Sequence, residues 1–242
     1  MCCSTASYSR AIAAGELTQL EWVDRCAHEL HVDGVDFDTR FFPRTDDEYL
    51  AQLKKLCADR CLTVVCVASA IEIGGDDVDA VLESFLPWIG HALALGAPLL
   101  RFRGGRVVGS PGVAWREFIR ALKAACAEAK RHNVTLALEA GDVGALVAAP
   151  SEMRRAFKEC DSAWLRLAMR GSDLTGSSGD EWRGLLEDTV VATTRSGDER
   201  ECGALQEAGF RGFVSLCYEG EQAEAGAVPA IFAALVRSSG RL

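Results

Sequence analysis

The sequence has no uninterrupted apolar run of the roughly 18 to 20 residues that a membrane-spanning helix needs. Met1 leads directly into structured-looking sequence, without the basic and apolar segments of a secretory signal. Basic residues are also scarce: 26 Lys and Arg face 35 Asp and Glu, which gives a net charge of −9. Proteins that bind nucleic acid usually carry a basic face, because they must neutralise phosphates. We therefore expect neither a membrane nor a nucleic acid as partner.

Catalytic and metal-binding signatures based on histidine and cysteine are missing as well. Ten cysteines are present, but none forms a CxxC pair; Cys57 and Cys61 are four residues apart. We interpret them as reduced, buried small side chains, which places the protein in the cytoplasm, and keep a zinc cluster as the weaker alternative. The four histidines fall in or just after helix-like segments: His28, His31, His91 and His132. A Ser-His-Asp or Cys-His mechanism therefore lacks a base.

Short apolar runs alternate with amphipathic runs along the whole chain. The expected strands are Cys2–Ser7, Val35–Asp38, Leu62–Ser69, Leu99–Arg103, Val134–Glu139, Trp164–Arg170, Thr189–Thr194 and Phe213–Cys217. Strands that alternate with helices indicate a parallel sheet with crossover connections. No GxGxxG follows the first strand, as it would in a dinucleotide-binding open sheet. Eight units predict an α/β fold, a single (β/α)8 TIM barrel domain over residues 1–242.

Polar and special residues mark the expected helix ends. Thr18 with Glu21, and Thr45 with Glu48, have the spacing of capping boxes. Ser110 and Ser151 are expected caps for the helices that follow the fourth and fifth strands.

Proline and glycine mark breaks. Pro87 should kink or split the helix over residues 77–95, and the Gly/Ser-rich residues 171–180 should form a loop. Glu199–Glu207 should be a short helix that Gly209 closes. The last helix is expected over Ala230–Val236, after Pro229.

Side chains on a strand alternate between two faces, and barrel active sites lie where the strands end. Leu136 and Leu138 suit the helix layer, so Glu139 should face inward. The same reasoning predicts a charged interior made of Asp36, Asp38, Glu139, Glu219, Arg101, Arg103, Arg166, Arg170 and Arg195, with Thr193, Ser215 and Cys217 also facing inward. Such a set could be an internal salt-bridge network or a cavity that binds an anion, because arginine suits phosphate and carboxylate. Both readings stay open, with Arg101 and Arg166 more in keeping with the structural one.

Five fragments in order give the chain a resemblance to xylose isomerase-like barrels, the group of sugar phosphate isomerases and epimerases. They are GVDFD (Gly34–Asp38), LGAPLLRFRGG (Leu95–Gly105), NVTLALEAG (Asn133–Gly141), SAWLRLAMRGSDL (Ser162–Leu174) and GFRGFVSLCYEG (Gly209–Gly220). The resemblance implies a divalent metal, Mn²⁺ or Mg²⁺, held at the ends of strands five to eight, and a sugar or sugar phosphate as substrate.

The metal ligands implied by the resemblance are mostly changed in this sequence. Glu139 matches the first ligand, whereas Arg170, Thr193 and Cys217 stand where an aspartate, a histidine and a glutamate would be expected. One carboxylate beside an arginine holds such a metal poorly. We therefore expect the metal to be lost and the guanidinium of Arg170 to pair with Glu139 in its place.

The remaining candidate residues follow from the same alignment. Glu139 is the best candidate base, and Glu219, two residues after Cys217, could assist it. Arg195 matches the strand-seven lysine that contacts substrate in the family. Cys217 is an inward thiol without a neighbouring base, so an inert role is favoured over a nucleophilic one. The expected substrate-binding residues are Asp38, Arg103, Arg170, Thr193, Arg195 and Cys217.

Two functions follow. The first is an isomerase or epimerase that acts on a sugar or sugar phosphate through a degenerate metal site. The second is a catalytically inactive barrel that binds an anionic carbohydrate. A DNA-repair endonuclease on the related barrel is disfavoured by the acidic charge and the absent ligand histidines. Substrate identity and the oligomeric state stay open.

Overall fold

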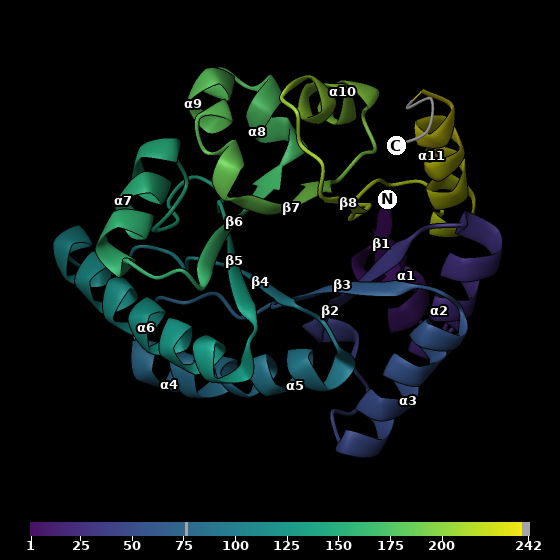
Figure 1. Ribbon diagram of the computed structural model, residues 1–242, viewed down its shortest axis with the longest axis horizontal. Coiled ribbons are helices and arrows are strands. Elements are labelled where there is room, and N and C mark those ends of the chain that lie inside the picture. Colours follow the sequence, from purple (N-terminus) through teal and green to yellow (C-terminus); the bar gives the residue numbers. More distant parts are fainter. Residues whose placement is uncertain (76, 239–242) are drawn as a thin grey trace.

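Eight parallel strands close into a barrel in the computed structural model, which describes residues 1–75 and 77–238 (Figure 1). Each strand pairs with the next one along the chain, and β1 pairs with β8 to close the ring. The strands are β1 (Cys2–Ser4), β2 (Gly34–Asp38), β3 (Thr63–Ala68), β4 (Leu99–Arg103), β5 (Thr135–Glu139), β6 (Leu165–Arg170), β7 (Thr189–Thr194) and β8 (Phe213–Leu216). The predicted (β/α)8 barrel is therefore confirmed.

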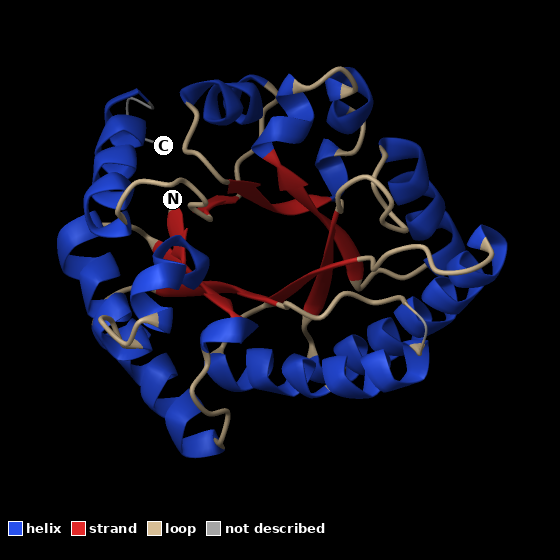
Figure 2. Cartoon of the chain, turned by 180° about the vertical axis from the view of Figure 1, so that it is seen from behind, coloured by secondary structure: helices blue, strands red, loops and turns tan. Residues whose placement is uncertain are grey.

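Helices surround the barrel on its outside (Figure 2). They are α1 (Ser9–Ala13), α2 (Gln19–Arg25), α3 (Asp47–Asp59), α4 (Val78–Phe85), α5 (Pro87–Leu95), α6 (Pro111–His132), α7 (Pro150–Cys160), α8 (Gly171–Thr175), α9 (Gly179–Arg183), α10 (Glu199–Glu207) and α11 (Glu224–Ser238). Four further short helical segments are η1 (Thr5–Tyr8), η2 (Cys26–Leu30), η3 (Thr39–Phe41) and η4 (Leu186–Asp188). All four histidines lie on helices or directly after them, as predicted.

The core has two parts, as the alternation along the strands predicts. Leu136 and Leu138 of β5 belong to the large apolar cluster between the barrel and its helices. Ala137, which points the other way, belongs to a small cluster inside the barrel. That inner cluster consists of Cys2, Val65, Cys66, Ala137, Ala168 and Val191. The small inner side chains leave room on the same inward faces for the charged residues at the strand ends.

The helix ends agree only in part with the sequence. The capping box of Thr18 and Glu21 is present at the start of α2. The second one is wrong, because Asp46 caps α3 and its carboxylate accepts from the backbone N–H of Tyr49. The predicted cap Ser151 lies inside α7, where the carboxylate of Glu152 accepts from the preceding backbone N–H groups instead.

Two further expectations need correction. Residues 171–180 are not one loop, because α8 and the start of α9 occupy all but the turn at residues 176–178. The carboxylate of Asp173 accepts from the backbone N–H of Arg170 and starts the first helical turn. The last helix begins at Glu224 rather than Ala230, with Pro229 inside it. The Glu224 carboxylate accepts from the backbone N–H groups of Arg10 and Ala11 and so holds the first turn against the N-terminal segment. Pro87 splits α4 from α5 as predicted.

Helices α4 and α5 together, Val78–Leu95, form the one segment of the described residues long and apolar enough by composition to be compared with a membrane span. Asp79 and Glu83 interrupt its apolar character. Its buried side chains, including Phe85 and Ile89, belong to the barrel core. The segment is accounted for as part of the outer helical layer.

Candidate active site at the mouth of the barrel

A cavity of about 260 Å³ opens where the strands end. Residues at the ends of four strands, β2 to β5, line it, together with residues that follow strand ends. The full set is Ala6, Asp38, Arg40, Ala68, Ser69, Ala70, Glu72, Arg101, Phe102, Arg103, Glu139, Cys217 and Glu219. A larger cleft of about 620 Å³ lies at the opposite end, between Met1, Phe213 and α10. We assign the site to the smaller cavity, because barrels of this kind place their chemistry at the carboxyl ends of the strands.

Arg101 lies at the centre of the cavity floor and bridges two buried carboxylates. Its Nη1 donates to Oε2 of Glu139 at 2.5 Å, and its Nη2 donates to Oδ2 of Asp36 at 2.8 Å. The same Nη2 contacts the sulfur of Cys217 at 3.7 Å. Asp36 also accepts from the hydroxyl of Ser215 at 3.0 Å. The inward register predicted for these side chains is thus confirmed, and Arg101 joins strands β2, β4, β5 and the end of β8.

Glu139 has both carboxylate oxygens engaged by guanidinium groups. Nε and Nη2 of Arg103 lie 3.0 and 2.9 Å from Oε1, while Arg101 takes Oε2. Burial opposes the charged form, but the two arginines outweigh it and hold the pKa of Glu139 below its usual value. The carboxylate is therefore ionised and doubly paired, which makes it a weak proton acceptor.

Asp36 behaves in the opposite way. Burial raises its pKa, although the charge of Arg101 and the hydrogen bonds from Arg101 and Ser215 oppose the shift. Oδ1 of Asp36 and Nε of Arg101 are buried without a hydrogen-bond partner among the described residues. The ion pairs at the centre of the site thus leave two buried polar atoms without a hydrogen bond among the described residues.

Asp38 and Arg40 form one wall of the cavity. Arg40 lies two residues after β2, and its Nε and Nη2 donate to the two oxygens of Asp38 at 2.9 and 2.7 Å. The Arg40 side chain is 57% exposed, so part of it stays accessible to solvent beside the cavity. Sequence reasoning missed Arg40, Ser69 and Glu72, although all three stand just past a strand end, where the rule that found the other residues could have been extended.

Three residues predicted to bind substrate lie outside the cavity lining: Arg170, Thr193 and Arg195. Arg170 pairs with Asp173 at 2.7 Å and approaches Asp142 at 3.7 Å, so the expected pair with Glu139 is wrong. The cause is α8, whose first turn brings Asp173 next to Arg170. Thr193, only 3% exposed, aligns with Arg170 in the β6–β7 register.

Two other arginines predicted to face inward have local partners. Arg195 lies 3.5 Å from Glu219. Arg166 donates to the carbonyl of Leu165 at 3.3 Å and makes no ion pair that joins it to the centre. The five arginines of the predicted interior therefore do not converge on one point; only Arg101 and Arg103 reach Glu139.

The donor set at the centre matches a divalent cation poorly. No group of three or more His, Cys, Asp or Glu side chains within residues 1–75 and 77–238 is placed to hold a metal ion. The carboxylate oxygens that could serve, those of Glu139 and Asp36, accept from Arg101, whose positive charge opposes a second cation there.

Comparison with known proteins agrees with this fold. The family model described as xylose isomerase-like TIM barrel matches residues 25–187. No curated protein matches the chain. L-ribulose 3-epimerase is similar in structure, with 16% identity, a TM-score of 0.79 and coverage of 99% of this chain and 95% of its own.

Other solved structures in the comparison carry different names. D-psicose 3-epimerase from Clostridium cellulolyticum H10 has 12% identity and a TM-score of 0.75, with 99% of this chain and 96% of that one covered. AP endonuclease, family 2, from Brucella melitensis has 16% identity and a TM-score of 0.75, with 90% and 94% covered. At such identities the likeness establishes the fold alone. With two thirds of its residues matched by the family model, the chain belongs to the xylose isomerase-like TIM barrel family.

Proposed function

We propose that this protein is a carbohydrate-binding barrel whose metal site is degenerate, with the guanidinium of Arg101 in the place of the cation. The observation that carries the proposal is the bridge from Arg101 to both Glu139 and Asp36. A metal-dependent isomerase needs those oxygens for its cation and a carboxylate free to take a proton. Here Arg101 occupies the oxygens that would bind the cation, and its charge keeps Glu139 from accepting a proton readily.

The charge of the cavity favours an uncharged sugar over a sugar phosphate. Arg40 is paired with Asp38, Arg103 with Glu139, and Arg101 with two carboxylates. Each guanidinium that could have bound a phosphate therefore already has a carboxylate partner. Binding a phosphate would require breaking one of these pairs, whereas hydroxyl groups can bond to the outer edges of the same arginines and carboxylates.

A metal-independent isomerase or epimerase is the second candidate, and Glu219 favours it. Its side chain is 58% exposed at the cavity, with one long contact to Arg195. Such a carboxylate could take a proton from a bound sugar, with Glu139 and the arginines holding the sugar's oxygens. Asp38, Arg103 and Cys217 would contact the ligand in either case, while Arg170, Arg195 and Thr193 would act from outside the cavity.

We also place the protein in the cytoplasm, since all ten cysteines are free thiols. The net charge of −9 supports a small-molecule partner rather than a nucleic acid.

Calorimetry with Mn²⁺, D-psicose, L-ribulose and D-fructose 6-phosphate tests the proposal. The wild-type protein should bind no Mn²⁺ and should bind at least one free ketose more tightly than the phosphate. Incubation with the ketoses, followed by NMR, should show no epimerised product. Stoichiometric Mn²⁺ binding would contradict the degenerate site, and product formed without metal would establish the second candidate instead.

A variant pair sharpens the metal experiment. Arg101→Met removes the guanidinium from Oε2 of Glu139 and Oδ2 of Asp36, while Arg103 stays on Oε1 of Glu139, so weak Mn²⁺ binding should appear. Arg166→Met removes an arginine that has no carboxylate partner at the centre, so it should bind no Mn²⁺.

A further inference from the structure

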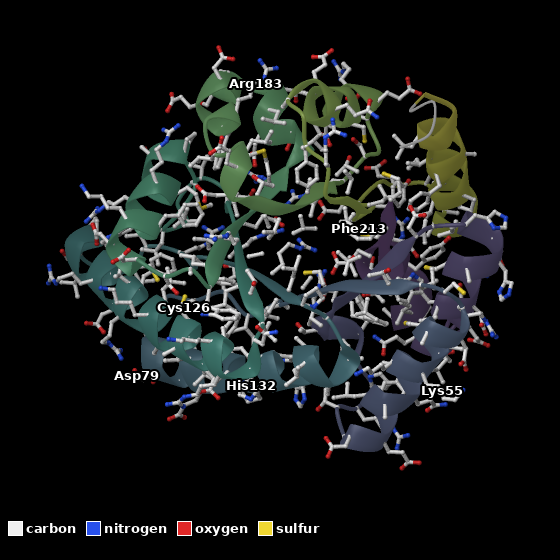
Figure 3. The ribbon with its side chains drawn as sticks, viewed as in Figure 1. Lys55, Asp79, Cys126, His132, Arg183 and Phe213 are labelled. Atoms are coloured by element: carbon white, nitrogen blue, oxygen red, sulfur yellow. The ribbon has the colours of Figure 1, made fainter. Side chains whose placement is uncertain are left out.

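Two cysteines meet where α6 packs against α7, on the outside of the barrel. Figure 3 labels Cys126 between these two helices. Its sulfur lies 3.7 Å from that of Cys160, the last residue of α7. The two positions are 34 residues apart in the sequence, so the contact exists only because the helices pack side by side.

We propose that Cys126 and Cys160 form a redox-responsive pair that closes to a disulfide when a peroxide reaches it. The two sulfurs, 3.7 Å apart, would have to close to roughly 2 Å to form a disulfide bond. Both residues are nearly buried, at 3% and 5% exposed. Cys160 is nonetheless at a helix end and is followed by the exposed residue Asp161, where local opening admits a small oxidant.

The surroundings assign different roles to the two sulfurs. The hydrogen bond between the two sulfurs, which either can donate, and the nearby charge of Lys123 lower the pKa of Cys160. The same hydrogen bond, together with burial, raises the pKa of Cys126. Because the positive charge of Lys123 acts on Cys160, we assign the attacking thiolate to Cys160 and the proton of the pair to Cys126.

The chemistry balances with hydrogen peroxide as the oxidant. The Cys160 thiolate attacks one peroxide oxygen, the O–O bond breaks, and a sulfenic acid forms as water leaves. The sulfur of Cys126 then attacks that of Cys160, the S–O bond breaks, and a second water leaves. In sum, two thiols lose two electrons and two protons, and one peroxide becomes two waters.

The cross-link would act on stability rather than on the cavity. Cys160 ends α7 just before β6 begins, so the pair lies towards the end of the barrel opposite the mouth. A bond there joins the helices that follow β4 and β5 and restricts the unfolded chain. Oxidation should therefore raise the melting temperature by roughly 5 °C while leaving ligand binding at the mouth unchanged.

The experiment is peroxide titration of the wild-type protein, followed by alkylation of free thiols and peptide mass spectrometry without reduction. A cross-linked peptide pair that contains Cys126 and Cys160 should appear in step with the rise in melting temperature, and dithiothreitol should reverse both. The exposed Cys61 provides the matched control: Cys61→Ser should give the same cross-link and the same shift.

Two further variants test the order of attack. In Cys126→Ala, dimedone should label a sulfenic acid at Cys160, whereas Cys160→Ala should give no label at Cys126. The proposal is overturned if both thiols stay alkylatable after Cys61 has been oxidised, or if the cross-link joins other cysteines. The cross-linking result on the wild-type protein decides the proposal even where one of the variants folds poorly.

Discussion

Replacing Arg101 by methionine should destabilise the protein strongly and in a pH-dependent way. The side chain is buried, and it is paired with Asp36 at 2.8 Å and Glu139 at 2.5 Å. Glu139 would keep Arg103 as a partner, but Asp36, which is fully buried, would keep only the hydroxyl of Ser215. Removing one partner of a buried ion pair costs roughly 3 to 5 kcal/mol because the other charge is left uncompensated.

The pH dependence follows from Asp36. Burial already raises its pKa in the folded protein, and loss of Arg101 should raise it further. A carboxyl with a raised pKa destabilises the folded state fully above its folded pKa, and the penalty disappears as the pH falls towards the unfolded value of about 3.9. The variant should therefore lose more stability at pH 8 than at pH 4.5.

Urea unfolding at these two pH values measures the effect. Arg166→Met is the matched control, since Arg166 is a strand arginine bonded only to a backbone carbonyl. The control should change the unfolding free energy by less than about 1 kcal/mol. Equal losses for the two variants, or an Arg101→Met loss that does not depend on pH, would refute the view that Arg101 compensates buried charge.

Two further predictions concern single sites. Glu139→Gln should lower the unfolding free energy by roughly 2 to 4 kcal/mol at pH 7 because two guanidinium groups lose their shared anion. The folded pKa of Glu139 lies below its usual 4.5, so this difference from wild type should persist above pH 4.5 and shrink below it. Urea titrations at several pH values measure it. Gly197→Ala should destabilise the folded protein more than Gly209→Ala. Both glycines have positive φ, but only at Gly197 would an added Cβ collide with a neighbour, 2.1 Å from Ile231. Equal melting temperatures for the two variants would contradict this.

Strand periodicity was enough to predict the barrel and most of the cavity floor. A strand in a closed barrel has an inside and an outside, so the alternation of Leu136, Ala137 and Leu138 determines where Glu139 points. The same local argument found Asp36 and Arg101. It needs no knowledge of partners, because side-chain direction is a property of each strand alone.

The alternation along a strand does not predict which inward side chains pair with each other. The sequence predicted which arginines face inward, yet it assigned Glu139 to Arg170 rather than to Arg101 and Arg103. Arg103 is level with Glu139 in the β4–β5 register, and Arg101 reaches it from one layer below. Arg170, on the next strand, pairs instead with Asp173, three residues further along the chain.

The sequence by itself determined the number of units, their order and the inward faces, because these depend on local periodicity and on the rule that parallel strands need crossovers. Only the tertiary structure decided that Arg101 is the shared cation of Asp36 and Glu139, residues 65 and 38 positions away along the chain. It likewise brought Cys126 to Cys160. Such pairings depend on strand stagger and helix packing, which arise when the barrel closes and leave no local trace in the residues themselves.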